Sequence, residues 1–262
     1  MTDADPRRVA GNVVCDLDGV VYLSEAGIPG AGEALAALEQ RGYRLVFATN
    51  APIRTAAEVA QHVAAMTGYP AREEQVVTSA MAAAGMLGPG DAPVLVVGEG
   101  GLGPTLRAAG LELTTDPDRA RSVVVGLDRR LTYDHLRAAT RAVLRGARLV
   151  ACNQDPTYPT ETGLWPGGGA IAAAIETAGG RAAEVAGKPY APMAEAVRRV
   201  LGPGPTWVVG DRPETDLALG RDEGWTTVLV LTGVVSDPGA LSPELRPDLV
   251  LPSLAALPAC LP

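Results

Sequence analysis

The sequence has few residues of the types that build histidine- or cysteine-dependent sites. His62 and His135 are the only histidines, and both lie in Ala- and Arg-rich, helix-like surroundings. A Ser-His-Asp hydrolase or a multi-histidine metal site therefore has very little to work with. The three cysteines, Cys15, Cys152 and Cys260, are widely spaced and form no C-x-x-C motif. This pattern argues against a disulfide framework or a zinc site and favours a reducing compartment, so we expect a cytoplasmic protein.

Long apolar runs and clustered positive charge are also missing. No hydrophobic stretch approaches the roughly 20 residues of a membrane helix, and residues 1–8 lack the apolar core of a signal peptide. The formal net charge of −8 argues against a nucleic-acid-binding surface. We therefore expect neither a nucleic acid nor a membrane as partner. An anionic small molecule remains compatible with this charge, because a metal ion or a lysine can invert the field of one cleft.

Lysine and asparagine are almost absent. The 22 Lys and Arg residues include a single lysine, Lys188, and the asparagines are Asn12, Asn50 and Asn153. Arginine does not replace lysine where a compact ammonium must contact a phosphoryl oxygen. Lys188 and Asn50 are therefore candidate functional residues, with chance survival as the alternative.

The residues that are present describe a soluble globule with an α/β pattern. A length of 262 residues, 47% hydrophobic, suits one large domain or two modest ones. Short apolar runs alternate with helical patterns throughout, which predicts parallel sheets joined by right-handed crossovers, a doubly wound Rossmann-like fold. The middle of the chain repeats this rhythm and can bury a core of its own.

Several segments carry specific structural expectations. The apolar runs ending at Cys15, Ala48 and Val209 predict buried strands of one sheet. Residues 153–169 are rich in Pro and Gly and predict a long loop, for which recognition and a solvated connector are nearly equal alternatives. Pro189 suits the first turn of a helix that reaches about Leu201, with another helix at residues 170–178.

The stretch Val13-Val14-Cys15-Asp16-Leu17-Asp18-Gly19 places two carboxylates directly after an apolar run. Because side chains alternate along a strand, both aspartates cannot lie in a sheet interior, so the strand is expected to end near Cys15. Asp16 and Asp18 then lie at the carboxyl edge of the sheet, where ligands bind in open α/β folds. Two acids at one edge favour a Mg²⁺ ion, whereas an Asx-turn is the structural alternative.

Polar groups follow three further strand or junction positions. Thr49-Asn50 ends the next apolar strand, and Gly210-Asp211 ends the strand at residues 207–209, with Asp216 five residues further. Lys188 lies at the junction of a strand and a helix start. Each position alone is compatible with an ordinary turn. Four such positions at one edge of a sheet are difficult to explain by structure alone.

Together these segments resemble the four ordered motifs of the haloacid dehalogenase superfamily. The matching segments are Asp16-x-Asp18-Gly19-Val20, Thr49-Asn50, Gly187-Lys188-Pro189 and Gly210-Asp211-x4-Asp216. Their spacing resembles the subclass IIA phosphatases, which include p-nitrophenylphosphatase-like, phosphoglycolate, pyridoxal-phosphate and glycerol-3-phosphate phosphatases. The resemblance implies a core of residues 1–79 and 185–262, with an α/β cap inserted at residues 80–184.

The resemblance also implies catalytic roles at the first and fourth motifs. Asp16 would be the nucleophile that forms an aspartyl-phosphate, and Asp18 would act as general acid and then base. The Asp16 and Asp211 carboxylates with the Asp18 carbonyl would hold Mg²⁺. The dehalogenases lack an acid at the position of Asp18, and transport ATPases carry Thr there, so a phosphatase fits best.

The remaining motif residues would bind the phosphoryl group. Thr49, the Asn50 backbone and Lys188 would contact its oxygens, and Asp216 would orient Lys188 or a metal-bound water from outside the metal's ligand shell. In relatives a second Asn often follows Asn50, where this chain has Ala51. The absence of that residue argues against pyridoxal phosphate as the substrate.

Substrate selectivity is less defined. Arg54 matches a frequently basic position and is expected to reach either a substrate or solvent, whereas Asn153 and Asp155 match a cap segment of relatives. The expected function is Mg²⁺-dependent hydrolysis of glycerol 3-phosphate, phosphoglycolate or a sugar phosphate, with a homodimer through the cap as a possible assembly. The alternatives are a phospho-accepting signalling receiver and a non-catalytic nucleotide- or sugar-binding protein.

Overall fold

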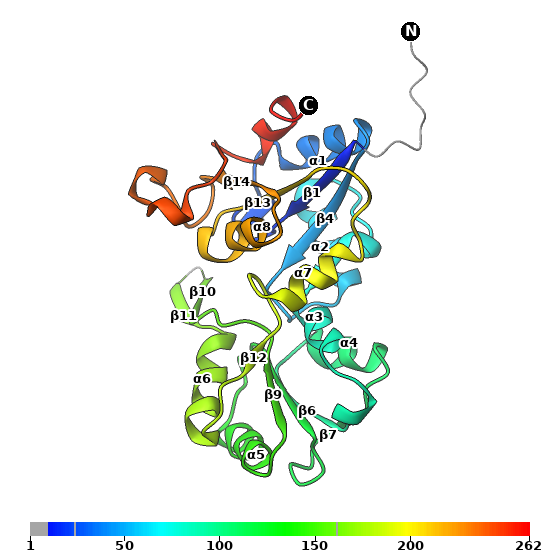
Figure 1. Cartoon of the computed structure of the whole chain (residues 1–262), viewed down its shortest axis with the longest axis vertical. Helices are drawn as coiled ribbons and strands as arrows, with labels where there is room; N and C mark the ends of the chain where they lie inside the picture. Colours follow the sequence, from blue (N-terminus) through cyan, green and yellow to red (C-terminus); the bar gives the residue numbers. More distant parts are fainter. Residues whose placement is uncertain (1–9, 24, 161) are drawn as a thin grey trace. The chain divides into compact units, whose positions relative to one another are not determined.

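The computed structural model describes residues 10–23, 25–160 and 162–262, and it has an α/β fold (Figure 1). Its contacts divide the chain into two compact units. We use the label core unit for Met1–Ala48, Ala57–Val76 and Val197–Pro262, and the label cap unit for Thr49–Ala56 and Val77–Ala196. These limits come from packing, and the motif-based cap boundaries at residues 80 and 184 stay a prediction.

The sheet of the core unit has six strands in the order β15-β14-β13-β1-β4-β5. The strands are β1 Gly11–Cys15, β4 Tyr43–Thr49, β5 Val76–Thr78, β13 Thr206–Gly210, β14 Thr226–Val230 and β15 Leu249–Leu251. β1 is fully buried and runs parallel to both neighbours, β13 and β4. The chain leaves β1 toward β4 on one side and returns through β13 on the other, which makes the β1/β13 boundary the topological switch point of this sheet.

Helices of the core unit follow the expected spacing. They are α1 Ala31–Gln40, α2 Ala56–Thr67 and α8 Ala218–Asp222. α1 buries Ala34, Leu35 and Leu38, one apolar face at helical spacing. Gly68 follows α2 with φ of 74°, the left-handed conformation that ends a helix without strain only at glycine or asparagine.

The cap unit has a parallel sheet of its own, in the order β12-β9-β8-β6-β7. Its strands are β6 Val94–Val97, β7 Leu113–Thr114, β8 Ser122–Val125, β9 Arg148–Ala151 and β12 Glu184–Val185. Its helices are α3 Ser79–Gly85, α4 Leu102–Ala108, α5 Tyr133–Leu144 and α6 Gly168–Gly179. Apolar residues of α5 and α6, including Val143 and Ile175, pack with Val123 and Leu149 of the strands, so this unit has a separate hydrophobic core.

Three expectations about local structure differ from the structure. The predicted loop at residues 153–169 contains a hairpin of β10 Thr157–Thr160 and β11 Gly163–Pro166. All four residues of β11 are exposed. The strand therefore has no buried face, and its sequence lacks the alternation of apolar and polar residues that indicates a strand. The helix expected from Pro189 is α7, Ala191–Arg198, which begins after that proline and ends before Leu201. α6 begins at Gly168, two residues before the expected start.

The asparagine nearest the N-terminus has a structural role in the core unit. The Asn12 side chain donates to the Gly202 carbonyl at 3.0 Å and to Thr206 Oγ1 at 3.2 Å, and it accepts from the Gly202 amide at 2.7 Å. It therefore fixes the turn before β13 against β1.

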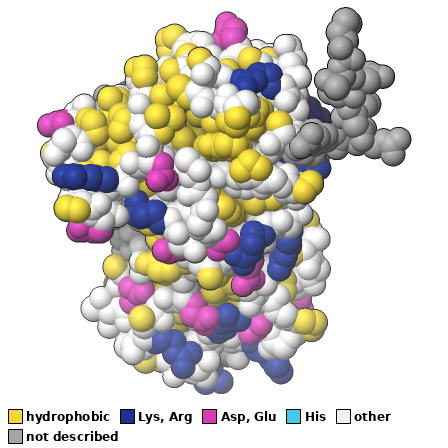
Figure 2. Space-filling view, turned by 45° about the horizontal axis from the view of Figure 1, so that its top comes forward, with side chains coloured by type: hydrophobic (Ala, Val, Ile, Leu, Met, Phe, Trp, Pro, Cys, Tyr) yellow, Lys and Arg dark blue, Asp and Glu magenta, His cyan; other side chains and the backbone are white. Residues whose placement is uncertain are grey.

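On the face shown in Figure 2, acidic and basic side chains are interspersed. None of the helices in the described part of the chain is long and apolar enough to cross a bilayer.

Candidate active site

β1 delivers Asp16 to the switch point of the core sheet. The Asp16 amide still donates to the Val209 carbonyl of β13 at 2.9 Å, so the chain keeps its register one residue past the end of β1. Asp16 is half-buried and Asp18 is exposed. The Gly19 amide then donates to the Tyr22 carbonyl at 2.8 Å, and Gly19 adopts a φ of 81°. The backbone therefore turns directly after the two aspartates, as the sequence indicates.

Asp16, Asp211 and Asp216 form an acidic cluster. One carboxylate oxygen from each residue lies within 4.8 Å of the other two. Asp211 and Asp216 expose only 2% and 1% of their surface. Three carboxylates at this separation repel one another strongly in a region shielded from water, so the cluster favours a neutralising cation. Oxygen ligands alone select a hard divalent ion such as Mg²⁺, so the residues present fit the predicted metal.

Glycines allow this cluster to pack against bare backbone. A Cβ at Gly19 would lie 2.6 Å from Asp211 Oδ2, and one at Gly233 would lie 2.0 Å from the same oxygen. A Cβ at Gly210 would lie 2.1 Å from the Asp216 Cβ. No side chain fits at these distances, so close approach requires all three glycines, and at Gly19 the φ of 81° requires glycine as well.

Backbone donors orient the two buried carboxylates. The Val234 amide donates to Asp211 Oδ2 at 2.8 Å, and the Arg212 amide donates to Asp216 Oδ2 at 3.2 Å. Thr232 Oγ1 donates to the Gly19 carbonyl at 2.6 Å, which ties the loop after β14 to the turn after β1. The loop after β14 therefore supports Asp211 through Thr232 and Val234.

In the cap unit, Asn50 clamps the backbone of Lys188. The Lys188 amide donates to Asn50 Oδ1 at 2.7 Å, and Asn50 Nδ2 donates to the Lys188 carbonyl at 3.2 Å. Lys188 is 4% exposed. A Cβ at Gly187 would lie 2.5 Å from Asn50 Oδ1, so the residue before the lysine must be glycine for the clamp to form. The two rare residues that composition singled out therefore lie in direct contact.

Two further side chains hold the Asn50 carbonyl. Ser79 Oγ donates to it at 2.7 Å, and Asn153 Nδ2 donates to it at 2.8 Å. Burial raises the pKa of the neighbouring Cys152 thiol to about 12, so this thiol stays protonated and unreactive. Ser79 was missed by the sequence reasoning, because a serine at the start of an Ala-rich helix is an ordinary residue there.

The other predicted residues of this region also have defined places. Thr49 is the last residue of β4, is buried, and accepts from the Ala51 amide at 3.1 Å. The Asp155 amide donates to Asn153 Oδ1 at 3.2 Å. Arg54 lines a pocket of the cap unit. The Asn153 contact positions Asn50, whereas substrate contacts of Asn153, Asp155 and Arg54 stay predictions.

Comparison with known families agrees with this geometry. A model described as haloacid dehalogenase-like hydrolase matches residues 13–112, and a second model of the same hydrolase type matches residues 185–257. Human chronophin is 42% identical over 244 residues, which cover 86% of this chain and 82% of chronophin.

The chain belongs to the haloacid dehalogenase-like hydrolases. The D-glycerol 3-phosphate phosphatase of Mycobacterium tuberculosis is 41% identical over 253 residues, which cover 94% of this chain and 70% of that protein. A crystal structure of a glycerol phosphate phosphatase from M. tuberculosis in complex with magnesium has a TM-score of 0.86 and 39% identity, and it covers 95% of this chain and 76% of that one. The predicted family, the α/β fold and an enzyme of the phosphatase class are thereby confirmed.

Proposed function

We propose that this hydrolase is a Mg²⁺-dependent phosphomonoesterase that acts on a small phosphorylated metabolite through an aspartyl-phosphate on Asp16. The observation that carries the proposal is the acidic cluster at the switch point of the core sheet. Three converging carboxylates repel one another, and a divalent cation relieves this repulsion. A relative crystallised with magnesium supports the choice of metal.

In the first step, an Asp16 oxygen attacks phosphorus and the bond from phosphorus to the leaving oxygen breaks. Asp18 donates its proton to that leaving oxygen, for which its exposed position beside Asp16 is suitable. Asp18, now ionised, takes a proton from the water that hydrolyses the aspartyl-phosphate, which releases phosphate and restores both carboxyl groups. Bound Mg²⁺ would neutralise negative charge on the phosphoryl oxygens.

The chain's own residues would hold the ion and the phosphoryl group. We assign Asp16, Asp211 and the Asp18 carbonyl to the metal, with Asp216 beside them as an orienting acid. Thr49, the Asn50 backbone and Lys188 are assigned to the phosphoryl oxygens, because a compact ammonium matches the charge that spreads over those oxygens during transfer. The Asn50 clamp supports this assignment because it fixes the lysine backbone.

Glycerol 3-phosphate, phosphoglycolate and sugar phosphates are the proposed substrates. The similarity to a D-glycerol 3-phosphate phosphatase supports the first of them. A panel of phosphorylated metabolites, compared by kcat/KM, ranks these candidates. A homodimer through the cap stays a prediction, which light scattering of the purified protein tests.

Steady-state hydrolysis of p-nitrophenyl phosphate with Mg²⁺ tests the function. A phosphatase gives many turnovers per chain, whereas a signalling receiver gives at most one phosphorylation and a binding protein gives none. Asp16→Asn is expected to abolish turnover, with the fold checked by circular dichroism. Wild-type turnover in this variant would contradict the assignment of the nucleophile.

The intermediate has a test of its own. p-Nitrophenolate leaves without a proton, so Asp18→Asn is expected to slow hydrolysis of the aspartyl-phosphate more than its formation. Acid-quenched Asp18→Asn protein should then gain the mass of one phosphoryl group, located at Asp16 by peptide mass spectrometry. The Asp16→Asn, Asp18→Asn double variant is the control and should gain none.

A further inference from the structure

A pocket of the cap unit is lined by none of the residues assigned to metal binding or phosphoryl transfer. It has a volume of about 550 Å³, the size of a pocket for a small metabolite, and it is lined by Ile53, Arg54, Glu99, Gly100, Arg129 and Arg130. Three of the six lining residues are arginines and one is acidic. In a chain of net charge −8, this is a local reversal of sign.

The position of this pocket follows from the topology of the cap sheet. Glu99 and Gly100 follow the carboxyl end of β6, whereas Arg129 and Arg130 follow the carboxyl end of β8. The chain leaves β6 toward β7 on one side and returns on the other side of β6 as β8. The β6/β8 boundary is therefore the switch point of a 2-1-3-4-5 sheet, the place where the loops diverge and open α/β sheets bind ligands.

Within the described residues, one of the three arginines has an anionic partner and two have none. Arg129 forms an ion pair with Glu99. The guanidinium groups of Arg54 and Arg130 make no hydrogen bond or ion pair within the described residues, although Arg54 is half-buried. Asp128 lies beside this pocket, but its carboxylate accepts from the Arg130 amide at 2.9 Å and contacts His135 Nδ1 at 3.3 Å. The pocket therefore holds excess positive charge that its neighbours do not neutralise.

Close backbone packing fixes the loops that carry these charges. Gly100 has a φ of 59°, and a Cβ there would lie 2.1 Å from the Ile53 carbonyl oxygen. The Gly101 amide donates to that same carbonyl at 2.8 Å. The Glu99 amide donates to the Leu127 carbonyl at 2.9 Å, which joins the loop after β6 to the loop after β8. The segment of Arg54 and the two loops therefore form one preorganised wall.

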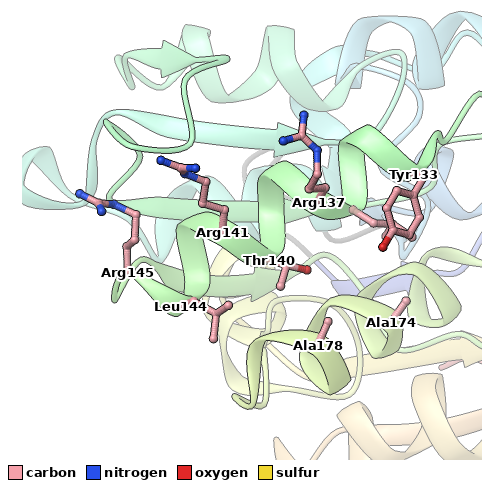
Figure 3. A pocket seen from close by; sticks show the side chains of 9 residues that line it. Tyr133, Arg137, Thr140, Arg141, Leu144, Arg145, Ala174 and Ala178 are labelled. Atoms are coloured by element: carbon pink, nitrogen blue, oxygen red, sulfur yellow. The ribbon is translucent and has the colours of Figure 1, made fainter.

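A larger groove in the same unit also contains arginines, but these have acidic partners. It runs between α5 and α6 and is lined by side chains that include Tyr133, Arg141, Leu144 and Arg145 (Figure 3). Arg141 and Arg145 both pair with Asp118, at 2.7 Å and 3.3 Å. Each arginine of that groove pairs with a carboxylate of the protein, and nothing in the structure indicates what would cover the groove.

We propose that the pocket of Arg54, Arg129 and Arg130 is an anion-binding site of the cap unit, which takes a small metabolite bearing a phosphate or carboxylate group. Guanidinium groups bind both kinds of anion through paired hydrogen bonds. The anion is either a second charged group of the substrate or a separate effector. Binding at this site does not require turnover, so it can be tested independently of the proposed hydrolysis.

Binding of inorganic pyrophosphate, followed by isothermal titration calorimetry in metal-free buffer, tests the site. Without a cation, the acidic cluster repels this probe. Arg130→Gln is expected to weaken binding about tenfold, the effect of one charge-assisted hydrogen bond. The matched control is Arg107→Gln, which removes the same charge from another exposed arginine of the cap unit. It should change the affinity by less than about twofold, since it removes only long-range attraction.

Two results would overturn the proposal: no saturable binding to the wild-type protein, or equal affinities in the Arg130→Gln and Arg107→Gln proteins. Steady-state kinetics then separate the two sources of the anion. If it belongs to the substrate, Arg130→Gln raises KM for phosphoglycolate, which has a carboxylate, but not for p-nitrophenyl phosphate. If it is a separate effector, both KM values stay at their wild-type levels while pyrophosphate binding is still weakened.

Discussion

The core and cap sheets place side chains by the same topological rule but with opposite charge. At the switch point of the core sheet, Asp16 and Asp211 directly follow β1 and β13. At the switch point of the cap sheet, the loops after β6 and β8 carry Glu99, Arg129 and Arg130. The fold therefore determines where a ligand can bind, whereas the residues just past each strand determine its charge.

The two places also differ in how tightly they are built. The carboxylates of the acidic cluster are packed against glycine backbone and accept backbone amides, so they can move little. In the cap pocket, the backbone is tight but the arginine side chains are longer and more exposed. A reaction that transfers a group between atoms needs the first arrangement, and recognition of a charged group is satisfied by the second.

Removal of divalent cations is expected to give the largest effect and to affect the core alone. Chelation should lower turnover of p-nitrophenyl phosphate at least about a hundredfold, because the metal contributes several kcal/mol to charge stabilisation. Mg²⁺ should restore the rate and raise the melting temperature, since it binds only the folded cluster. The Asp211→Asn protein should lose the rise in melting temperature caused by Mg²⁺ and should still bind pyrophosphate in the cap pocket. If both responses disappeared together, the two sites would not be separate.

Lys188→Arg keeps the charge and changes only its shape. We expect kcat to fall roughly tenfold to a hundredfold, because a planar guanidinium cannot occupy the place of a compact ammonium. Arg130→Lys makes the reverse exchange in the cap pocket and should leave kcat unchanged. Steady-state kinetics of both variants make the comparison, and wild-type kcat in Lys188→Arg would refute the role assigned to this residue.

Asn50→Ala tests whether the clamp positions Lys188. Loss of two hydrogen bonds of about 0.5–1.5 kcal/mol each predicts a fall in kcat of roughly tenfold. Because the lysine side chain is retained, inorganic phosphate should still inhibit, with a weaker inhibition constant. Ser79→Ala removes a donor to the Asn50 carbonyl but leaves the clamp, so its effect should be smaller. An equal loss in the two variants would indicate a general structural defect.

The smallest expected effects concern one surface carboxylate in each unit. Hydrogen bonds from the Thr227 amide and hydroxyl lower the pKa of Asp248 in the core, and the Arg148 guanidinium lowers the pKa of Glu184 in the cap. Because both folded-state pKa values are lowered, the stabilisation is present above pH 4 or so and is lost as the pH falls through the folded-state pKa.

Asp248→Asn and Glu184→Gln should therefore each reduce the drop in melting temperature between pH 7 and pH 3. High salt should diminish the effect at Glu184 more than at Asp248, because an exposed ion pair is screened and hydrogen bonds to the backbone are not. Melting curves at low and high NaCl concentration measure this difference. Equal salt sensitivity would show that the two carboxylates are stabilised in the same way.

Much of the site could be predicted from the sequence because the strands that deliver it are short, apolar and bounded by polar residues. The apolar run before Asp16, the Thr49-Asn50 strand end and Gly210-Asp211 all lie at strand ends in the structure. The hairpin of β10 and β11 could not be predicted, because its exposed strand has no buried face. The support given by Ser79 and Val234 was also invisible, since a hydroxyl or a backbone amide has no distinctive sequence pattern.

The sequence by itself determined the chemistry that is present: aspartates after a buried strand, one lysine, and few histidines or cysteines, in an order typical of one hydrolase family. Only the tertiary structure decided which of these residues meet. Asp211 approaches Asp16 because parallel strands bring their ends to one edge, and the helical turn at Pro213–Leu217 adds Asp216 to them. Asn50 clamps Lys188 across 138 positions of sequence. Such contacts depend on strand order and on close backbone approach at glycines, and local sequence preferences encode neither.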